Sequence, residues 1–421
     1  MPISFDPFAS DWRPDPYPVY RRLRDEAPVH YSAEREIYSV TRYDDVMRVL
    51  RTPDLFSSRA MFTMLMSGGS DKLPPLSLDL VRFLARMAWK TRMNPFEFQT
   101  ARNLIAEDGE SHAKLRAIVN RGFTPKRIES WEGRAREIVE SCVEPLRRGQ
   151  PFDVVTQLAI PLPVTLIAEM LGVPAERHAD FKRWSDMIID FSSGPGRDDP
   201  FSKKYRLGFS ELMVCLKELV KQRRSKPEDD LVSVIVAEQD GEAGLSVREV
   251  IQFVMLLMAA GNETTTNLIG NLVNALLDHP EQAEKVANDP SLVPDLVEEG
   301  LRYDAPVQLV FRTTTRDTEL RGTKIPEGSF VAAYLGSANR DERRFEAPDR
   351  LDVTRKAQPF PGFGFGKHFC LGASLARLEA RVALEAILPQ FPGLVRSGGP
   401  VSHVDSFFVR GPRRLELKLA A

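Results

Sequence analysis

Residues 363–372 read FGFGKHFCLG, a glycine-rich and aromatic loop with one cysteine near its end. A helical pattern follows from Leu371 to Leu388, so Cys370 stands directly before a helix. Free backbone N–H groups and the helix dipole lower the pKa of a thiol placed there, and the thiolate is the form that binds metals. The glycines let the backbone curl around the sulfur, and Phe363 can shield it from water. Cys370 is therefore a candidate metal ligand, while an inert buried cysteine remains the alternative.

The composition around this loop is that of an ordinary globular protein. Of 421 residues, 43% are hydrophobic and 28% are charged, and the net charge of −2 gives no overall attraction to nucleic acid or an anionic membrane. Cys142, Cys215 and Cys370 are too few and too scattered for a disulfide framework. No basic and apolar leader begins the chain, and the apolar region 250–260 is shorter than a membrane span. We therefore expect a cytoplasmic protein without nucleic-acid or membrane partners.

The longest predicted helix begins at a capping box. Ser246 and Glu249 have the spacing at which each side chain bonds to the other residue's backbone, and the helical pattern continues to Asp278 before Pro280 ends it. At about 1.5 Å per residue, this helix would be roughly 50 Å long. Its apolar middle must then lie inside a large core.

The remaining sequence predicts mostly helices with a minor set of strands. The region 17–50 has a helix, two short strands and another helix, and strand-like residues return in 307–314, 319–320 and 329–334. Met61–Phe98 is unusual because it contains five methionines, which suit variable apolar surfaces. This segment is either a helix-and-loop excursion that packs on the core or a lid that faces a substrate.

The cysteine loop resembles the haem-binding loop of the cytochrome P-450 family, whose pattern is F-x-x-G-x-H/R-x-C-x-G. Phe363, Gly366, His368, Cys370 and Gly372 match every defined position. The resemblance implies that the Cys370 thiolate binds the iron of haem b (iron protoporphyrin IX) and that His368 reaches a haem propionate. It also implies that Gly372 leaves space for the flat cofactor. Thiolate ligation donates electron density to the iron and favours cleavage of the O–O bond.

The middle of the long helix is similar to a second motif of this family, A-G-x-D/E-T. Residues 260–264 read AGNET. By themselves they could be a helical irregularity whose threonine bonds to the preceding turn. The resemblance implies that Ala260 and Gly261 lie beside the haem, with Gly261 opening a groove for dioxygen. It further implies that Thr264 stabilises the bound oxygen by a hydrogen bond and that Glu263 relays protons.

Three more residues match positions at which the family binds haem propionates. His112 and Arg116 lie one helical turn apart and are similar to the family's H-x-x-x-R helix, although such a pair is usually a solvated surface feature. Arg312 matches an arginine on the strand that follows the E-x-x-R helix. An arginine can bind a carboxylate through two parallel hydrogen bonds, which suits this role.

Glu299 and Arg302 resemble the family's E-x-x-R pair. Taken alone, opposite charges at this spacing are usually an exposed ion pair of little energetic value. The resemblance implies a buried pair bridged by an arginine from a later loop, for which Arg350 is the candidate. We assign all three residues a structural role.

The resemblance spans essentially the whole chain and implies a mainly α protein with a minor β part. The implied fold is the cytochrome P-450 fold, a single triangular domain over residues 1–421 that encloses haem b. The implied reaction inserts one atom of dioxygen into a lipophilic small molecule, most simply as a hydroxylation. A terpenoid, steroid, polyketide or fatty acyl substrate is expected, and the candidate pocket residues are apolar: Leu256, Ala259, Val307, Leu309, Val310 and Phe407.

The implied electron supply is a separate protein. No G-x-G-x-x-G motif follows a predicted strand, so a ferredoxin or flavodoxin with its NAD(P)H reductase is the expected partner of a monomeric enzyme. The basic residues near the haem-ligand segments could form its docking patch: Lys114, Arg121, Lys126, Lys367 and Arg377. Two alternatives remain, a peroxide-driven haem-thiolate peroxygenase and a non-catalytic haem or recognition module.

Overall fold

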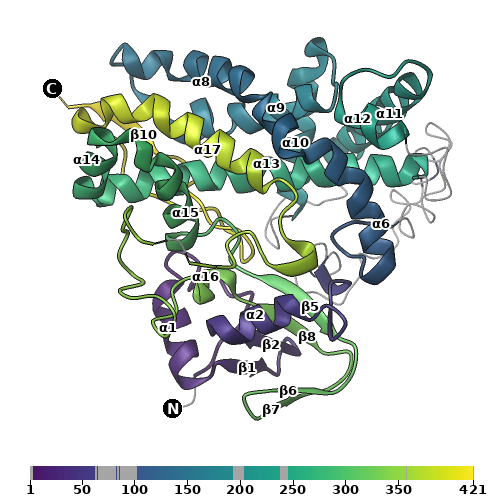
Figure 1. The fold of residues 1–421 in the computed structure, drawn as a ribbon, viewed down its shortest axis with the longest axis vertical. Coiled ribbons are helices and arrows are strands. Elements are labelled where there is room, and N and C mark those ends of the chain that lie inside the picture. Colours follow the sequence, from purple (N-terminus) through teal and green to yellow (C-terminus); the bar gives the residue numbers. More distant parts are fainter. Residues whose placement is uncertain are drawn as a thin grey trace. The chain divides into compact units, whose positions relative to one another are not determined.

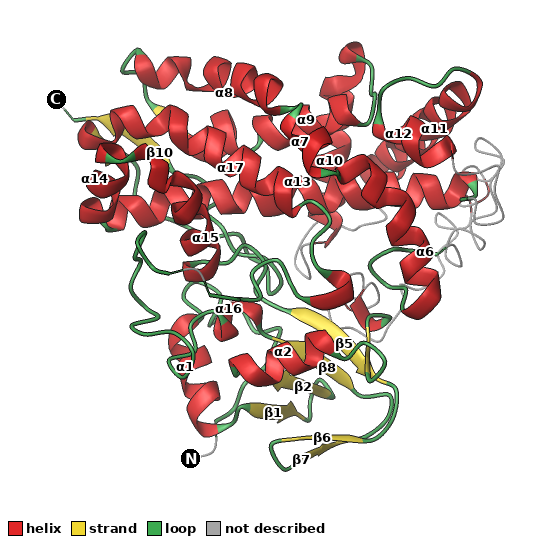
Figure 2. Cartoon of the chain, in the orientation of Figure 1, coloured by secondary structure: helices red, strands yellow, loops and turns green. Residues whose placement is uncertain are grey.

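The computed structural model describes residues 3–61, 102–192, 203–237, 245–356 and 358–420, together with Met64, Arg82 and Ala85. Nearly all of Met61–Phe98 lies outside this set, so both interpretations of that segment stay predictions. Helices dominate the described chain and strands are few, which confirms a mainly α protein with a minor β part (Figure 2). Within the described ranges, no helix has the length and apolar character needed to cross a membrane.

Two compact units make up the chain. The first contains residues 1–61, 125–163 and 263–421, and the second contains residues 62–124 and 164–262. The longest helix, α13 (Val247–Asp278), contributes residues to both. The expectation of one domain over the whole chain stays a prediction, and each unit is considered by itself.

The sheet of the first unit has the order β1–β2–β8–β5–β3. Its strands are β1 (Val29–Ser32), β2 (Ile37–Val40), β3 (Phe56–Ser57), β5 (Val310–Thr314) and β8 (Phe330–Ala333). The pair β2–β8 is parallel and the other pairs are antiparallel, so Arg312 on β5 lies opposite Val331 on β8. Helix α2 (Tyr43–Arg51) lies beside this sheet (Figure 1). Its Val46 and Val49 are buried in one hydrophobic cluster with Val40 and Val331 of the sheet.

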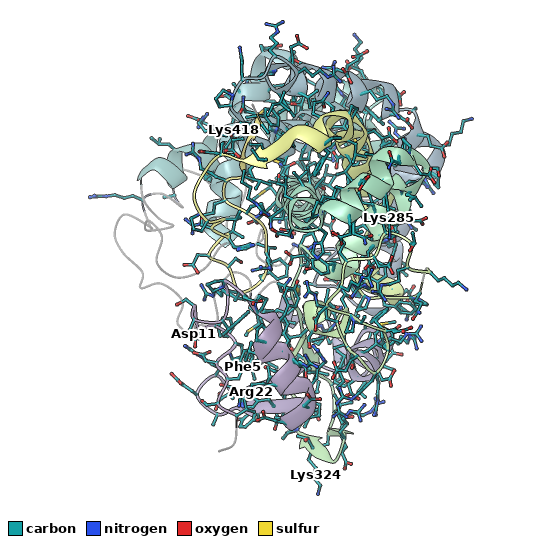
Figure 3. The ribbon with its side chains drawn as sticks, turned by 90° about the vertical axis from the view of Figure 1, so that its left-hand side faces the viewer. Phe5, Asp11, Arg22, Lys285, Lys324 and Lys418 are labelled. Carbon is teal, nitrogen blue, oxygen red and sulfur yellow. The ribbon has the colours of Figure 1, made fainter. Side chains whose placement is uncertain are left out.

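Aromatic residues of the N-terminal segment pack in the core of the first unit. Phe5 is labelled in Figure 3. Its ring centroid lies 5.6 Å from that of Trp12 and 5.8 Å from that of Tyr334. Helix α1 (Tyr17–Glu26) and the short α16 (Leu335–Ala338) pack on each other here.

The helical part of the first unit is centred on α17 (Ala373–Ile387), which packs on α8 (Glu132–Arg147) and α15 (Val293–Tyr303). Two arginines and two glutamates join α17 to α8 in a closed ring of ion pairs, made by Glu132, Arg136, Arg381 and Glu385. The other helices are α7 (Pro125–Glu129) and α14 (Pro280–Asn288). The remaining strands form a three-stranded sheet and a hairpin: β4 (Phe152–Asp153), β9 (Leu394–Arg396), β10 (Glu416–Leu419), β6 (Thr318–Leu320) and β7 (Thr323–Ile325).

The second unit is helical where it is described. Helix α11 (Lys203–Ser225) packs on α10 (His178–Ser192) and on α12 (Leu231–Val236), which in turn contacts α6 (Gly109–Asn120). Helix α9 (Pro161–Met170) belongs to the first unit up to Pro163 and to the second unit from Val164. A buried ion pair between Arg223 and Asp230 closes the turn between α11 and α12.

Candidate functional site

The loop that carries Cys370 is closed by its own backbone. The Cys370 N–H donates a hydrogen bond to the Phe363 carbonyl at 2.9 Å, and the Phe369 N–H donates to the Gly366 carbonyl at 3.1 Å. Phe363 and Cys370 are therefore held together, although six residues separate them in the sequence. Helix α17 begins at Ala373, slightly later than predicted.

Two glycines give this loop its shape. Gly364 has a φ of +72° and Gly366 a φ of +74°, a left-handed conformation that other residues adopt only at a steric cost. A Cβ on Gly366 would lie 3.1 Å from the Leu50 carbonyl oxygen at the end of α2. The loop is thus pressed against α2, and a side chain at residue 366 would force the two apart.

The space beside Gly372 is open. A Cβ on this glycine would meet no atom within 4 Å, although the next residue, Ala373, is buried. Cys370 itself is partly exposed. A partly exposed thiol just before the start of a helix is the arrangement that a haem-thiolate site requires.

The middle of α13 also has an open face. Met258 is fully buried, but Ala260 is exposed, and a Cβ on Gly261 would meet no atom within 4 Å. Glu263 and Thr264 are partly buried. The apolar helix therefore becomes accessible at the residues that the A-G-x-D/E-T resemblance selects, which fits a cofactor and a small gaseous ligand.

The threonines next to Thr264 anchor this part of α13 inside the first unit. The Thr265 hydroxyl donates a hydrogen bond to the Glu379 carboxyl group on α17, and the Thr266 hydroxyl donates to the Ala159 carbonyl at 2.9 Å. Glu379 is buried, and burial raises its pKa to about 8. No local pattern indicated that this carboxyl group is buried, because a glutamate in a charged amphipathic helix is normally exposed.

The candidate propionate ligands occupy different elements. His112 on α6 is only 3% exposed, and Arg116 one turn later donates from Nε to the Asn120 side chain at 3.1 Å. Arg312 is buried on β5 and donates to the Phe311 carbonyl at 2.7 Å. His368 ends the short turn after Gly366 and is partly buried. Their binding of propionates stays a prediction.

Glu299 and Arg302 form a buried bidentate ion pair on α15, with both N–O distances 2.8 Å. The prediction that Arg350 bridges this pair is wrong. Arg355 donates from Nε to Glu299 at 3.1 Å, whereas Arg350 is exposed and contributes only its carbonyl, which accepts from Arg302 at 3.2 Å. A turn in which the Arg355 N–H bonds to the Asp352 carbonyl directs the later arginine inward.

The candidate pocket residues divide into two groups. Leu256 and Ala259 in the second unit and Val307 and Val310 in the first are partly buried, and their contact with a substrate stays a prediction. Leu309 and Phe407 are 0% and 1% exposed, so the prediction that they line a pocket is wrong for this structure. The Phe8 ring lies 4.8 Å from the Phe407 ring, and packing of the distant N-terminal segment was not visible in the local sequence.

Comparisons with known proteins agree with this geometry. The family model described as cytochrome P450 matches residues 84–419. The structure is similar to that of cytochrome P450 CYP109Q5 from Chondromyces apiculatus, with a TM-score of 0.84 and 38% identity, covering 100% of this chain and 99% of that chain. It is also similar to CYP109E1 from Bacillus megaterium in complex with corticosterone, with a TM-score of 0.81 and 32% identity, covering 97% and 99%. In sequence, the chain is 36% identical to a vitamin D(3) 25-hydroxylase from Pseudonocardia autotrophica, covering 98% of this chain and 96% of the relative.

Proposed function

The chain belongs to the cytochrome P450 family, and we propose that it hydroxylates a lipophilic molecule of the steroid type with electrons from a separate ferredoxin or flavodoxin. Membership makes the chain a haem-thiolate monooxygenase with haem b as its cofactor. The observation that carries the proposal is the Cys370 loop, in which a thiol precedes α17 and borders the open surface at Gly372.

The bound haem supplies the iron at which dioxygen is activated. In our proposal, the Cys370 thiolate is its protein ligand, and Phe363 excludes water from the sulfur. His112, Arg116, Arg312 and His368 bind the propionates, because imidazole and guanidinium N–H groups form charge-assisted hydrogen bonds with carboxylates.

Glu263 and Thr264 deliver protons in this proposal. Both are partly buried, so the carboxylate can exchange protons with water while the hydroxyl lies next to it on the helix. The anchoring of Thr265 and Thr266 to Glu379 and Ala159 restricts rotation of α13 about its axis. The Thr264 hydroxyl is thereby kept in one direction, which is the positioning that a proton donor needs.

A steroid-like substrate is favoured by two observations. Leu256, Ala259, Val307 and Val310 are apolar and incompletely buried, as expected of residues that contact a lipophilic ligand. Two of the similar proteins are a vitamin D(3) 25-hydroxylase and an enzyme crystallised with corticosterone. Polyketides, terpenoids and fatty acyl compounds are the other outcomes of a substrate test.

The first experiment is a spectroscopic titration of the haem-loaded protein with a panel of steroids, terpenoids, polyketides and fatty acids. A steroid should change the haem spin state at a lower concentration than any other class. Response to another class, with none to steroids, would refute the proposed substrate class. Cys370→Ala should abolish the spectrum of the thiolate-ligated ferrous carbonyl complex, and an unchanged spectrum would exclude Cys370 as the ligand.

The second experiment separates the rival reactions. Reductase, ferredoxin, NAD(P)H and oxygen should give a hydroxylated steroid. Product formation with hydrogen peroxide alone would identify a peroxygenase. Steroid binding without product under either condition would identify a non-catalytic module.

A further inference from the structure

Arg377 on α17 is held in a fixed position beside the cysteine loop. Its Nε and a terminal guanidinium nitrogen donate to the two carboxylate oxygens of Glu298 on α15, at 2.5 and 3.1 Å. This bidentate pairing uses the edge of the planar guanidinium and leaves its faces available.

One face of this guanidinium covers an aromatic ring of the loop. The central carbon of Arg377 lies 4.6 Å from the Phe363 ring centroid, well within cation–π range. A second aromatic ring of the loop is covered in the same way, because the central carbon of Arg51 on α2 lies 4.6 Å from the Phe365 ring centroid. The aromatic residues on both sides of Gly364 are thus stacked on arginines from different helices.

Phe363 connects this stacking to the sulfur-bearing residue. Its carbonyl accepts the Cys370 N–H at 2.9 Å, and its ring lies edge-on to the Phe369 ring at 6.2 Å. Phe369 is exposed and Phe363 is only partly exposed, so the Phe363 ring is the less accessible ring of this pair. A shift of Phe363 would loosen the backbone bond to Cys370 and admit water to the sulfur.

We infer that Arg377 and Glu298 are positioning residues that set the reduction potential and the stability of thiolate ligation by bracing Phe363 over the Cys370 loop. The inference rests on the proposed haem-thiolate function. It differs from the docking role that the sequence predicted for Arg377, because the guanidinium is engaged by Glu298 and Phe363. Water at the sulfur stabilises negative charge on it, which weakens donation to the iron and favours the reduced state.

The test uses two changes that separate stacking from charge. Arg377→Lys keeps the positive charge beside Glu298 but loses the planar, two-pronged geometry. The double variant Arg377→Met with Glu298→Gln removes the stacked pair and leaves no unpaired charge. Arg381→Lys is the matched control, because Arg381 stands one turn further along α17 in the ion-pair ring with Glu132 and Glu385.

Each haem-loaded protein is measured for its reduction potential and for the rate at which its ferrous carbonyl complex loses thiolate ligation. Arg377→Lys and the double variant should both shift the potential upward and lose the thiolate about five-fold faster, the factor that one cation–π contact supplies. Arg381→Lys should match the unmodified protein in both measurements.

Unchanged potential and ligation, with only a higher KM for ferredoxin in the double variant, would overturn the inference in favour of docking. An equal effect of Arg381→Lys would also overturn the inference, because any weakening of α17 would then be enough to change the potential and the thiolate ligation. If the unmodified protein takes up no haem, the proposed function itself has failed, and this outcome is seen before any variant is compared.

Discussion

Replacing Glu379 by glutamine should stabilise the protein near neutral pH. The Glu379 side chain lies on α17 and is only 2% exposed, with the Thr265 hydroxyl as its hydrogen-bond donor. Burial raises the pKa of this carboxyl group from 4.5 to about 8. Near neutral pH, the group is therefore protonated in the folded chain and ionised in the unfolded chain.

The sign and size of the effect follow from this difference in pKa. A raised carboxyl pKa contributes stability that is fully present below pH 4.5 and is lost as the pH rises through about 8. Each pH unit in this interval costs about 1.4 kcal/mol, so the folded state loses about 3 kcal/mol between the unfolded pKa and neutral pH. Glutamine has a similar shape, accepts the Thr265 bond and never ionises, so it avoids this loss.

The assay is the thermal unfolding midpoint of the haem-loaded protein as a function of pH. For a chain of 421 residues, 1 kcal/mol corresponds to roughly 1 °C. Glu379→Gln should therefore melt about 3 °C higher than the unmodified protein near neutral pH, and the difference should vanish towards about pH 4.5. Glu379→Ala should share the flatter pH dependence but melt lower throughout, because it leaves a cavity. Parallel curves for the glutamine variant and the unmodified protein would refute the reasoning, since they would show equal pKa values in both states.

Three further predictions concern the loop, the proton path and the buried ion pair. Gly366→Ala should lower the free energy of unfolding by about 2 kcal/mol or more, because it adds left-handed strain to a clash with the Leu50 carbonyl. Urea unfolding and haem content measure this effect, and full haem retention at unchanged stability would contradict it. Thr264→Ala should lower the product formed per NAD(P)H by roughly ten-fold or more and raise hydrogen peroxide, with substrate affinity unchanged; equal product yield would exclude a proton role. Arg355→Met should destabilise the protein by about 3 kcal/mol, since it leaves Glu299 with one guanidinium fewer, whereas Arg350→Met should have almost no effect. If Arg350→Met instead lowered the denaturant midpoint more than Arg355→Met, the sequence-based assignment of Arg350 would be restored.

Local patterns predicted the elements that local interactions build. The capping box of α13 forms as expected, because the Ser246 N–H donates to the Glu249 carboxylate at 2.7 Å, and the helix ends at Asp278 as predicted. The cysteine loop was recognisable because glycines and the ligand lie within ten residues of each other. The short strand β7 was missed, since three residues carry too little periodicity.

Features that depend on distant packing could not be predicted. Phe407 is enclosed by Phe8 from the other end of the chain, so an apolar residue expected at a pocket became part of the core. Glu379 is buried on α17, and its hydrogen-bond partner Thr265 lies on α13, far away in the sequence. Arg355, and not Arg350, binds Glu299, because the turn after Asp352 sets which guanidinium points inward. No residue pattern specified that turn.

The buried Glu299–Arg302 pair has a consequence for how this protein can diversify. Beyond Glu299, Arg302 donates only to main-chain carbonyls, those of Asn339, Pro348 and Arg350, at 3.0, 2.8 and 3.2 Å. Every amino acid offers the same carbonyl, so these three hydrogen bonds depend on the path of the loop and not on its side chains. The one side chain of the loop that Arg302 does contact is Phe345, whose ring centroid lies 5.6 Å from the central carbon of the guanidinium. Exposed positions between residues 339 and 350 can therefore be exchanged, by mutation over time or by grafting in the laboratory, while the pair on α15 holds the segment. Glu342 is the exception, because its carboxylate pairs with the buried Arg24.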